Sequence, residues 1–214
     1  MKIILERTQA EIVEKKSRFI ANIAPVNSEE EAIEFIEGIR KKYYDARHNC
    51  YAYIIGEDGE KKKCSDDGEP QRSAGMPMMD VLENQGYFNI VAVVTRYFGG
   101  TLLGVGGLIR AYQRAVIKAL TLSKIGEIHI GVRVKYKMGY DFYGKVKYIA
   151  ESENAVIEDT SFDDKVTISL IFEDKENERL QKKIMEETNA NVSKVFSEKI
   201  RYITTEGKWY KEYK

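Results

Sequence analysis

A run of glycines between two apolar segments is the feature of this sequence that most directly suggests chemistry. Residues 90–94 form a continuous apolar run typical of a buried strand, and the apolar residues of 108–120 recur at helical spacing. A strand, a glycine-rich turn and a helix N-terminus together direct free backbone N–H groups at an anion. We therefore expect an anion or phosphate contact here, with Arg96 and Arg110 beside it; tight packing of strand against helix is the alternative interpretation. The glycines of the run are Gly99, Gly100, Gly104, Gly106 and Gly107.

This glycine run lacks the signatures of the common nucleotide sites. No Gly-Lys-Ser or Gly-Lys-Thr ends it, so it is not a P-loop. Ile109 occupies the third glycine position of a dinucleotide-binding fingerprint counted from Gly104. An enzyme that binds a nucleotide or another small molecule in the glycine turn is therefore kept as the alternative hypothesis.

Three carboxylates within four residues follow a strand predicted over 61–65. Asp66, Asp67 and Glu69 could hold Mg²⁺ or supply general acid–base pairs. Their spacing does not fit a calcium loop, which needs oxygen ligands at alternate positions. A turn punctuated by glycine and proline, with its acids solvated, is favoured; a partner-binding loop is the second interpretation. We predict no metal and no cofactor, and keep the three acids as candidate binding residues.

His48, Cys50 and Cys64 do not complete a metal or catalytic motif. The histidine precedes the two cysteines by two and sixteen residues, and the paired short spacings and fourth ligand of a structural zinc site are missing. Both cysteines fall in predicted strands, where a reduced, half-buried thiol is expected. His48 is kept as a candidate partner-binding residue.

Composition excludes several classes of protein. The chain has 214 residues, 43% of them hydrophobic, so it can bury a core and is not disordered. Its 34 basic and 34 acidic residues balance, so any nucleic-acid binding must come from a local patch. No secretory signal and no apolar run of about 18–20 residues is present. We expect a cytoplasmic protein that does not bind membranes.

The first part of the chain alternates strands and helices. Strands are predicted near residues 2–6, 11–15, 18–23, 49–55 and 61–65, with a turn at 56–59. Ser28 and Glu31 form a capping box that begins a helix closed by the basic residues 40–42. A polar loop is predicted over 66–77, and a short helix from about 78 to 85 precedes the strand and glycine turn.

The second part predicts the order β-α-β-β-α-β. Apolar residues alternate strictly from Ile128 through Ile130 to Met138, which indicates a half-buried strand. A helix over 141–152, strands over 155–160 and 166–172, a helix over 174–188 and a strand over 192–203 follow. This order is typical of the ferredoxin-like module. The tail 208–214 is expected to be a docked or frayed terminus.

A basic stripe is predicted on the sheet of this second part. If the apolar residues of its first strand face the helices, then Arg133, Lys135 and Lys137 lie on the opposite face. In a ferredoxin-like sheet the last strand lies beside the first, where Lys199 and Arg201 can face the same way. The stripe would suit a phosphate backbone or a protein. It lacks the aromatic residues that read bases, and an ordinary solvated sheet face is the alternative.

Four segments together resemble the YigZ/IMPACT family. They are 45–53 (Asp-Ala-Arg-His-Asn-Cys-Tyr-Ala-Tyr), 66–70 (Asp-Asp-Gly-Glu-Pro), 74–77 (Ala-Gly-Met-Pro) and 95–112, which holds the glycine run. One departure is Arg72-Ser73, where the family typically has a Gly-Thr pair. The resemblance implies an N-terminal domain over 1–126 with the ribosomal protein S5 domain 2-like α/β sandwich. It implies a ferredoxin-like domain over 127–214, similar to domain V of elongation factor G.

The resemblance also implies a role in translation. Eukaryotic members of the family are linked to translational control through competition for a Gcn-type activator of a stress kinase. We therefore expect a non-enzymatic factor that binds RNA, the ribosome or a translation-associated protein. Its candidate surfaces are the glycine turn, the acidic residues 66–69 and the basic stripe. A shared fold alone does not establish that function.

Overall fold

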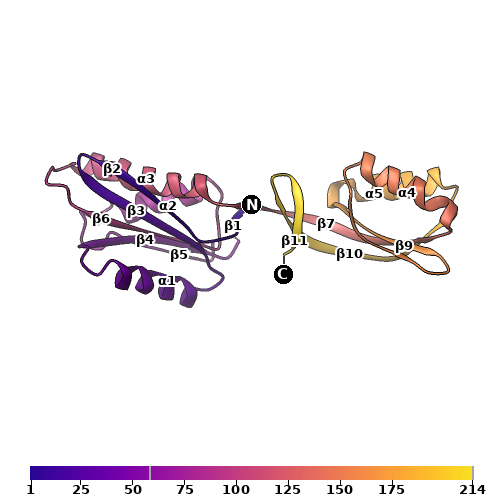
Figure 1. The fold of residues 1–214 in the computed structure, drawn as a ribbon, viewed down its shortest axis with the longest axis horizontal. Coiled ribbons are helices and arrows are strands. Elements are labelled where there is room, and N and C mark those ends of the chain that lie inside the picture. Colours follow the sequence, from indigo (N-terminus) through magenta and orange to yellow (C-terminus); the bar gives the residue numbers. More distant parts are fainter. Residues whose placement is uncertain (58, 214) are drawn as a thin grey trace. The chain divides into compact units, whose positions relative to one another are not determined.

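The computed structural model describes residues 1–57 and 59–213, and it divides into two compact units, Met1–Glu127 and Ile128–Lys214 (Figure 1). Within the described residues, no helix combines the length and apolar character needed to cross a membrane. The turn predicted at 56–59 includes residue 58, which lies outside the described residues.

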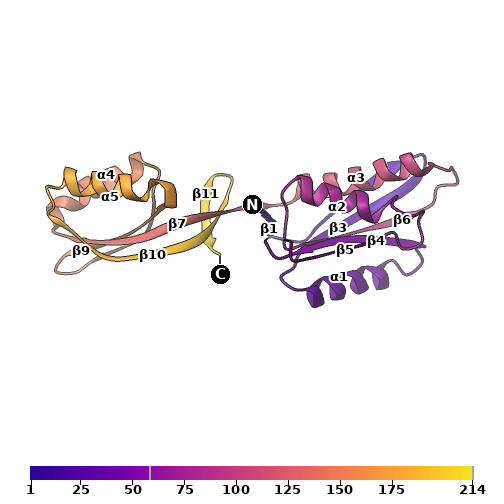
Figure 2. The ribbon, with the colours of Figure 1, turned by 180° about the vertical axis from the view of Figure 1, so that it is seen from behind.

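The first unit is a five-stranded sheet with helices on both faces. Its strand order is β2-β3-β6-β4-β5, and every neighbouring pair is antiparallel. Helix α1 covers one face, and α2 and α3 cover the other (Figures 1 and 2). Outside this sheet, β1 (Lys2–Ile4) pairs with the first residues of β7. The sheet strands are β2 (Thr8–Glu14), β3 (Ser17–Pro25), β4 (His48–Ile55), β5 (Lys61–Ser65) and β6 (Ile90–Tyr97), and the helices are α1 (Glu29–Lys42), α2 (Gly75–Asn84) and α3 (Val105–Leu122).

The capping box predicted for α1 is confirmed. Ser28 Oγ accepts a hydrogen bond from the Glu31 N–H at 3.2 Å, and the Glu31 carboxylate accepts one from the Asn27 N–H at 2.8 Å. Two donors at the helix start are thereby satisfied. The helix then buries Ala32, Ile36 and Ile39 against β4 and β6.

Helix α2 begins earlier than its sequence pattern predicts. It starts at Gly75, whereas the apolar spacing predicts a start near Met78 and a loop through Pro77. Pro77 lies in the first turn, where a missing N–H removes no intrahelical hydrogen bond. The proline is therefore compatible with a helix that begins at Gly75.

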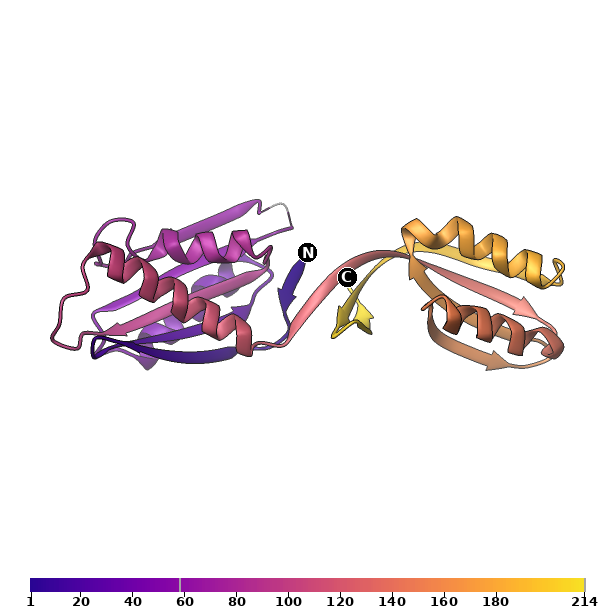
Figure 3. The ribbon, with the colours of Figure 1, turned by 90° about the horizontal axis from the view of Figure 1, so that it is seen from above.

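The second unit has the predicted β-α-β-β-α-β order, followed by one more strand. Its sheet order is β11-β10-β7-β9-β8, with α4 and α5 side by side over one face (Figure 3). The core between helices and sheet contains Val134, Tyr136, Leu170 and Ile184. The elements are β7 (Ile125–Met138), α4 (Tyr140–Ser152), β8 (Val156–Phe162), β9 (Val166–Glu173), the 3-10 helix η1 (Asp174–Glu176), α5 (Asn177–Glu187), β10 (Val192–Thr205) and β11 (Lys208–Glu212).

Two details of this unit differ from the sequence expectations. Ile130 continues the apolar alternation but is 57% exposed, because the core beneath the helices begins only at Val132. The aromatic tail is docked: β11 pairs with β10, and Trp209 packs on a cluster that contains Ile171, Ile200 and Tyr202. This small cluster lies on the sheet face opposite the helices, because Ile171 is in register with Arg133.

Candidate functional site

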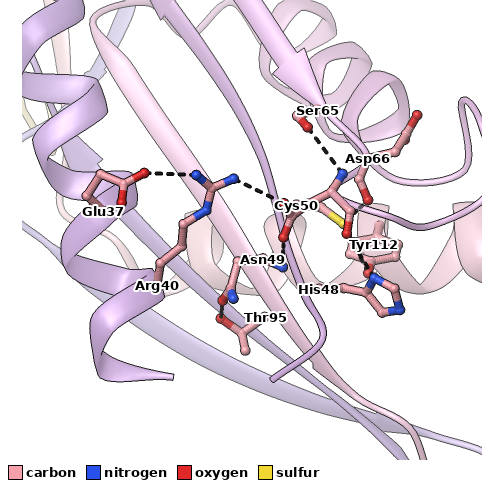
Figure 4. Close-up of polar contacts among 10 residues, drawn as sticks. Glu37, Arg40, His48, Asn49, Cys50, Ser65, Asp66, Thr95 and Tyr112 are labelled. Carbon is pink, nitrogen blue, oxygen red and sulfur yellow. Dashed lines mark hydrogen bonds and ion pairs between the residues drawn. The ribbon is translucent and has the colours of Figure 1, made fainter. Parts of the chain in front are cut away.

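The loop 66–75, called here the acidic loop, packs against β4 and β6 of the first unit. It draws together five of the residues selected from the sequence, which come from β4, the loop and β6. Their polar atoms bond mainly to one another and to the backbone. Figure 4 shows the part of this network around His48 and Asp66. These five residues are His48, Asp66, Asp67, Glu69 and Arg96.

Asp66 holds the acidic loop closed and caps α2. Its carboxylate accepts hydrogen bonds from the N–H groups of Arg72 at 2.7 Å, Ala74 at 3.0 Å and Gly75 at 2.9 Å. Helix α2 has no cap from its own N-cap side chain, so Asp66 supplies this acceptor from outside the helix. Arg72 adopts a left-handed φ of 62°, a conformation that favours glycine, which is the residue expected here from the family resemblance.

Replacing Asp66 by alanine should destabilise the first unit by about 1–3 kcal/mol, because the buried Ala74 and Gly75 lose the acceptor for their N–H groups. Hydrogen exchange followed by mass spectrometry should show faster exchange across residues 72–78. The control is Asp80→Ala, which removes an exposed carboxylate from the same helix. Unchanged protection in the Asp66 variant would contradict the capping role.

Asp67 joins the acidic loop to α1 and β4. Its carboxylate accepts from the Asn49 N–H at 2.7 Å and from Arg40 Nη2 at 3.1 Å (Figure 4). The Asp67 carbonyl lies 2.9 Å from His48 Nδ1, so this ring nitrogen carries the proton and donates. The favoured interpretation of solvated acids is therefore wrong for Asp66 and Asp67, whose oxygens hold the loop in place.

Glu69 and Arg96 form a buried ion pair. Arg96 Nη1 donates to Glu69 Oε1 at 2.7 Å, and their side chains are only 8% and 3% exposed. Tyr112 of α3 donates a further hydrogen bond to the same oxygen at 2.8 Å. The guanidinium also lies 5.5 Å from the ring centre of Phe19 and 5.7 Å from that of Phe98. Arg96 is thus neutralised inside the unit, and the expectation that it contacts an anion beside the glycine turn does not fit this geometry.

Cys50 and Tyr112 belong to the same network, and the sequence analysis did not select them. Burial raises the pKa of the Cys50 thiol, which stays protonated and donates to the Asp66 carbonyl at 2.9 Å. Burial likewise raises the pKa of Tyr112. The spacing of Tyr112 marked it only as a core position; its hydroxyl on a buried helix face was the signal of a polar partner.

The network does not have the arrangement of a metal or acid–base site. In the described parts of the chain, no group of three or more His, Cys, Asp or Glu side chains is placed to hold a metal ion. The oxygens of the three loop acids point to different partners: backbone N–H groups, Arg40 and Arg96. The acids that an enzyme would need here for metal binding or acid–base catalysis are therefore already engaged in hydrogen bonds and ion pairs within the unit.

The glycine turn (residues 98–107) follows β6 and, unlike the buried network, exposes several of its side chains. A Cβ on Gly99 would lie 2.0 Å from the Lys16 backbone, so the turn packs directly on the β2–β3 hairpin. Gly104, at φ 69°, is the N-cap of α3, and no side chain caps this helix. Gly100 has a positive φ, whereas Gly106 and Gly107 lie in the first turn of α3. Three apolar side chains of the turn are exposed: Phe98 by 57%, Leu102 by 83% and Val105 by 52%.

A small basic hollow lies beside the glycine turn. Its volume is about 150 Å³, and Lys15, Gly107, Arg110 and Arg114 contribute to its lining. Arg114 pairs with Glu14 at 2.8 Å, whereas Lys15 and Arg110 form no ion pair with any residue that the structure describes. The sequence pattern pointed to Arg110 but not to Lys15, which the β2–β3 hairpin brings close from about 95 residues away in the chain.

The basic stripe of the second unit is interrupted at Arg133. Its guanidinium donates to Glu158 of β8, Glu198 of β10 and Glu212 of β11 at 2.5–2.8 Å. Three carboxylates around one arginine leave the cluster with a formal charge of −2. Lys135 lies 5.5 Å from the Phe196 ring, and Lys137 is exposed. A phosphate backbone would meet net negative charge at this point of the sheet face.

Lys199 and Arg201 do not lie on the same face as Arg133. Adjacent residues of a strand point to opposite faces, and Glu198, next to Lys199, bonds to Arg133. Lys199 instead pairs with Asp174 at 3.2 Å. Arg201 lies between Ile200 and Tyr202, which pack on the Arg133 face. The expectation that Lys199 and Arg201 face the same way as Arg133 was therefore wrong, because the alternation of β10 places both cations on the opposite face.

Known proteins resemble this chain in sequence and in structure. The family model of the Impact N-terminal domain matches residues 15–120, and a domain of unknown function (DUF1949) matches 137–191. IMPACT family member YvyE of Bacillus subtilis (strain 168) is 38% identical over 193 residues, which cover 87% of this chain and 86% of that protein. The chain belongs to the IMPACT family. The acidic loop, the glycine turn and the Glu69–Arg96 pair described above thus lie in the Impact N-terminal domain of a family member.

Other IMPACT family proteins match shorter parts. YigZ of Escherichia coli (strain K12) is 47% identical over 108 residues, which cover 50% of this chain and 53% of YigZ. Protein IMPACT of Mus musculus is 37% identical over 98 residues, which cover 44% of this chain and only 30% of the mouse protein. A solved structure of a hypothetical protein aligns with a TM-score of 0.57 at 29% identity, covering 90% of this chain and 95% of its own.

Proposed function

We propose that this IMPACT family member is a non-enzymatic factor of translation regulation that binds the ribosome through its glycine turn. Family membership supports the link to translation, since eukaryotic members are connected with translational control. The observation that carries the site is the exposed turn itself: Leu102 is 83% exposed, and Leu103 and Gly107 of the turn line one hollow with Lys15 and Arg110, which form no ion pair with the described residues. The occupied acids of the acidic loop favour binding over catalysis.

The chemistry of the turn suits a ribonucleoprotein surface. Unpaired lysine and arginine side chains next to a helix N-terminus attract phosphate groups. Phe98, Leu102 and Val105 offer apolar contacts to unstacked bases or to a ribosomal protein. Binding through this surface should be sensitive to salt because phosphate contacts release counterions. The interrupted basic stripe of the second unit favours the glycine turn over the sheet face.

We further propose a specific fold for each of the two units and a cellular location for the protein. The first unit would be a ribosomal protein S5 domain 2-like sandwich over about 1–126, and the second a ferredoxin-like domain over about 127–214. The second assignment is supported by the β-α-β-β-α-β order of elements along the chain, which is that of the ferredoxin-like module. It is also supported by the sheet, in which the last strand of this unit of six elements, β10, lies beside the first, β7. A ribosome-binding factor of this kind would work in the cytoplasm.

Co-sedimentation with ribosomes tests the proposed function. The double variant Lys15→Glu/Arg110→Glu should bind about tenfold more weakly than the wild type at low salt, and its binding should fall less steeply with salt. The matched control, Lys147→Glu/Lys182→Glu, makes the same charge change on exposed helix positions of the second unit. An equal loss of ribosome binding in both double variants would show that net charge, and not the glycine turn, determines binding. If the wild type does not pellet with ribosomes at any salt concentration, ribosome binding is refuted.

A further inference from the structure

A groove runs along the open side of α1 in the first unit. Helix α1 is alone on its face of the sheet (Figures 1 and 2) and contacts chiefly β4 and β6, whereas residues of β2 and β3 line the groove beside it. The groove has a volume of about 760 Å³, in the range of binding sites. Its lining includes Gln9, Asn22 and Ala24 from the strands and Phe35, Gly38 and Ile39 from α1.

A buried amide without a partner lines this groove. Asn22 is only 6% exposed, and its Nδ2 forms no hydrogen bond with the described residues. A buried donor left unpaired costs about 1–3 kcal/mol, so such groups are rare in folded proteins. A ligand in the groove that offers an oxygen acceptor would remove this cost.

A glycine in the middle of α1 keeps the groove open. Gly38 is exposed, and a Cβ built on it would meet nothing within 4 Å. Glycine in a helix interior costs about 1 kcal/mol relative to alanine. No packing contact of this unit requires that glycine, whereas a ligand lying across the helix would need the space.

The α1 side of the groove carries opposite charge at its two ends. Glu31 and Glu34 lie at the start of α1, and Lys41 and Lys42 at its end. The other charged lining residues are engaged: Arg7 lies over the Phe35 ring at 5.5 Å, and Glu37 pairs with Arg40. Lys42 keeps its charge while it donates to Gln9 at 3.0 Å. Lys41 lies ten helical positions after Glu31, which is about 15 Å along the helix axis. An extended chain covers this distance with about four or five residues.

We propose that this groove binds a short extended peptide segment of a partner protein, basic at one end and acidic at the other. The basic end would lie over Glu31 and Glu34, and the acidic end over Lys41 and Lys42. A main-chain carbonyl between the two ends would accept from Asn22. A molecule the size of a mononucleotide would not span the distance of about 15 Å between the two charged ends. This inference does not rest on ribosome binding, because the groove and the glycine turn use different residues.

Fluorescence anisotropy with dye-labelled seven-residue peptides tests the groove. One peptide has two lysines, three alanines and two glutamates in that order, a second has the reverse order, and a third alternates the charges. One of the two block-charged peptides should bind saturably with a Kd below about 1 mM, as expected for a short segment. The alternating peptide should bind at least tenfold more weakly.

Variants separate a ligand site from a structural role. Gly38→Leu fills the groove and should weaken peptide binding at least tenfold; Gly144→Leu is the control, since Gly144 in α4 also has open space at its Cβ. Asn22→Leu should lose binding without a fall in melting temperature, because Nδ2 forms no hydrogen bond with the described residues and the cost of its burial is removed. All three variants should pellet with ribosomes like the wild type, which distinguishes failure here from failure of the proposed function.

Three results would overturn the peptide site. The first is equal binding of block-charged and alternating peptides. The second is undiminished binding by Gly38→Leu. The third is a response of groove residues in NMR spectra to AMP but to none of the peptides, which would assign the groove to small molecules.

Discussion

Replacing Glu69 by alanine should destabilise the first unit by about 3–5 kcal/mol, which is the usual effect of removing one partner of a buried ion pair. The variant leaves the Arg96 guanidinium uncompensated at 8% exposure and removes the acceptor of the Tyr112 hydroxyl. Such a loss is a large fraction of the 5–15 kcal/mol that stabilises typical proteins. The glycine turn should loosen as well, because Phe98 packs on Arg96.

Hydrogen exchange of the full chain measures this effect unit by unit. Amides of β4, β6 and α3 should lose protection in the Glu69 variant, while those of the second unit should not change. The control, Glu14→Ala, breaks an exposed pair with Arg114 and should cost less than about 1 kcal/mol. A Glu69 variant as stable as this control would show that the buried pair does not hold the acidic loop.

Arg133→Ala should destabilise the second unit by about 2 kcal/mol at neutral pH, below the cost of a fully buried pair because its glutamates are 24–42% exposed. The variant leaves three carboxylates facing one another without their shared cation. Trp209 is the sole tryptophan of the chain and packs on the neighbouring apolar cluster. Its fluorescence during urea denaturation therefore reports on this unit.

The pH dependence of the Arg133 variant should be opposite to that of the wild type. The Arg133 guanidinium lowers the pKa of Glu158 below its ordinary value of 4.5. In the wild type this contribution is present above that ordinary pKa and is lost as the pH falls through the lowered one. Without Arg133, repulsion from the neighbouring carboxylates should raise the pKa of Glu158, so stability should decline as the pH rises through that pKa. A variant whose stability rises with pH like the wild type would contradict the cluster.

Local signals in the sequence predicted much of the fold. The capping box located the start of α1, and the alternating apolar residues of β7 identified a half-buried strand from Val132 onward. Both patterns depend on neighbours within a few residues, where spacing alone determines which face is buried.

Features that depend on distant residues were missed or wrong. The acids around Arg133 come from three strands, and the faces of β10 depend on a register that spacing does not fix. The acidic loop looked solvated because its partners Arg40, Asn49 and Arg96 lie 18 to 27 residues away. Only the folded unit shows that these groups bond to one another.

A photo-crosslinking amino acid at Leu102 tests ribosome binding through the glycine turn most directly. Leu102 is 83% exposed at the tip of the turn, and Tyr148 of α4, at 71%, is the control position in the second unit. Irradiation with purified ribosomes should attach the position-102 variant to ribosomal RNA or protein at low salt, and the position-148 variant only weakly. No crosslink from position 102, or equal crosslinking from both positions, would contradict binding through this turn.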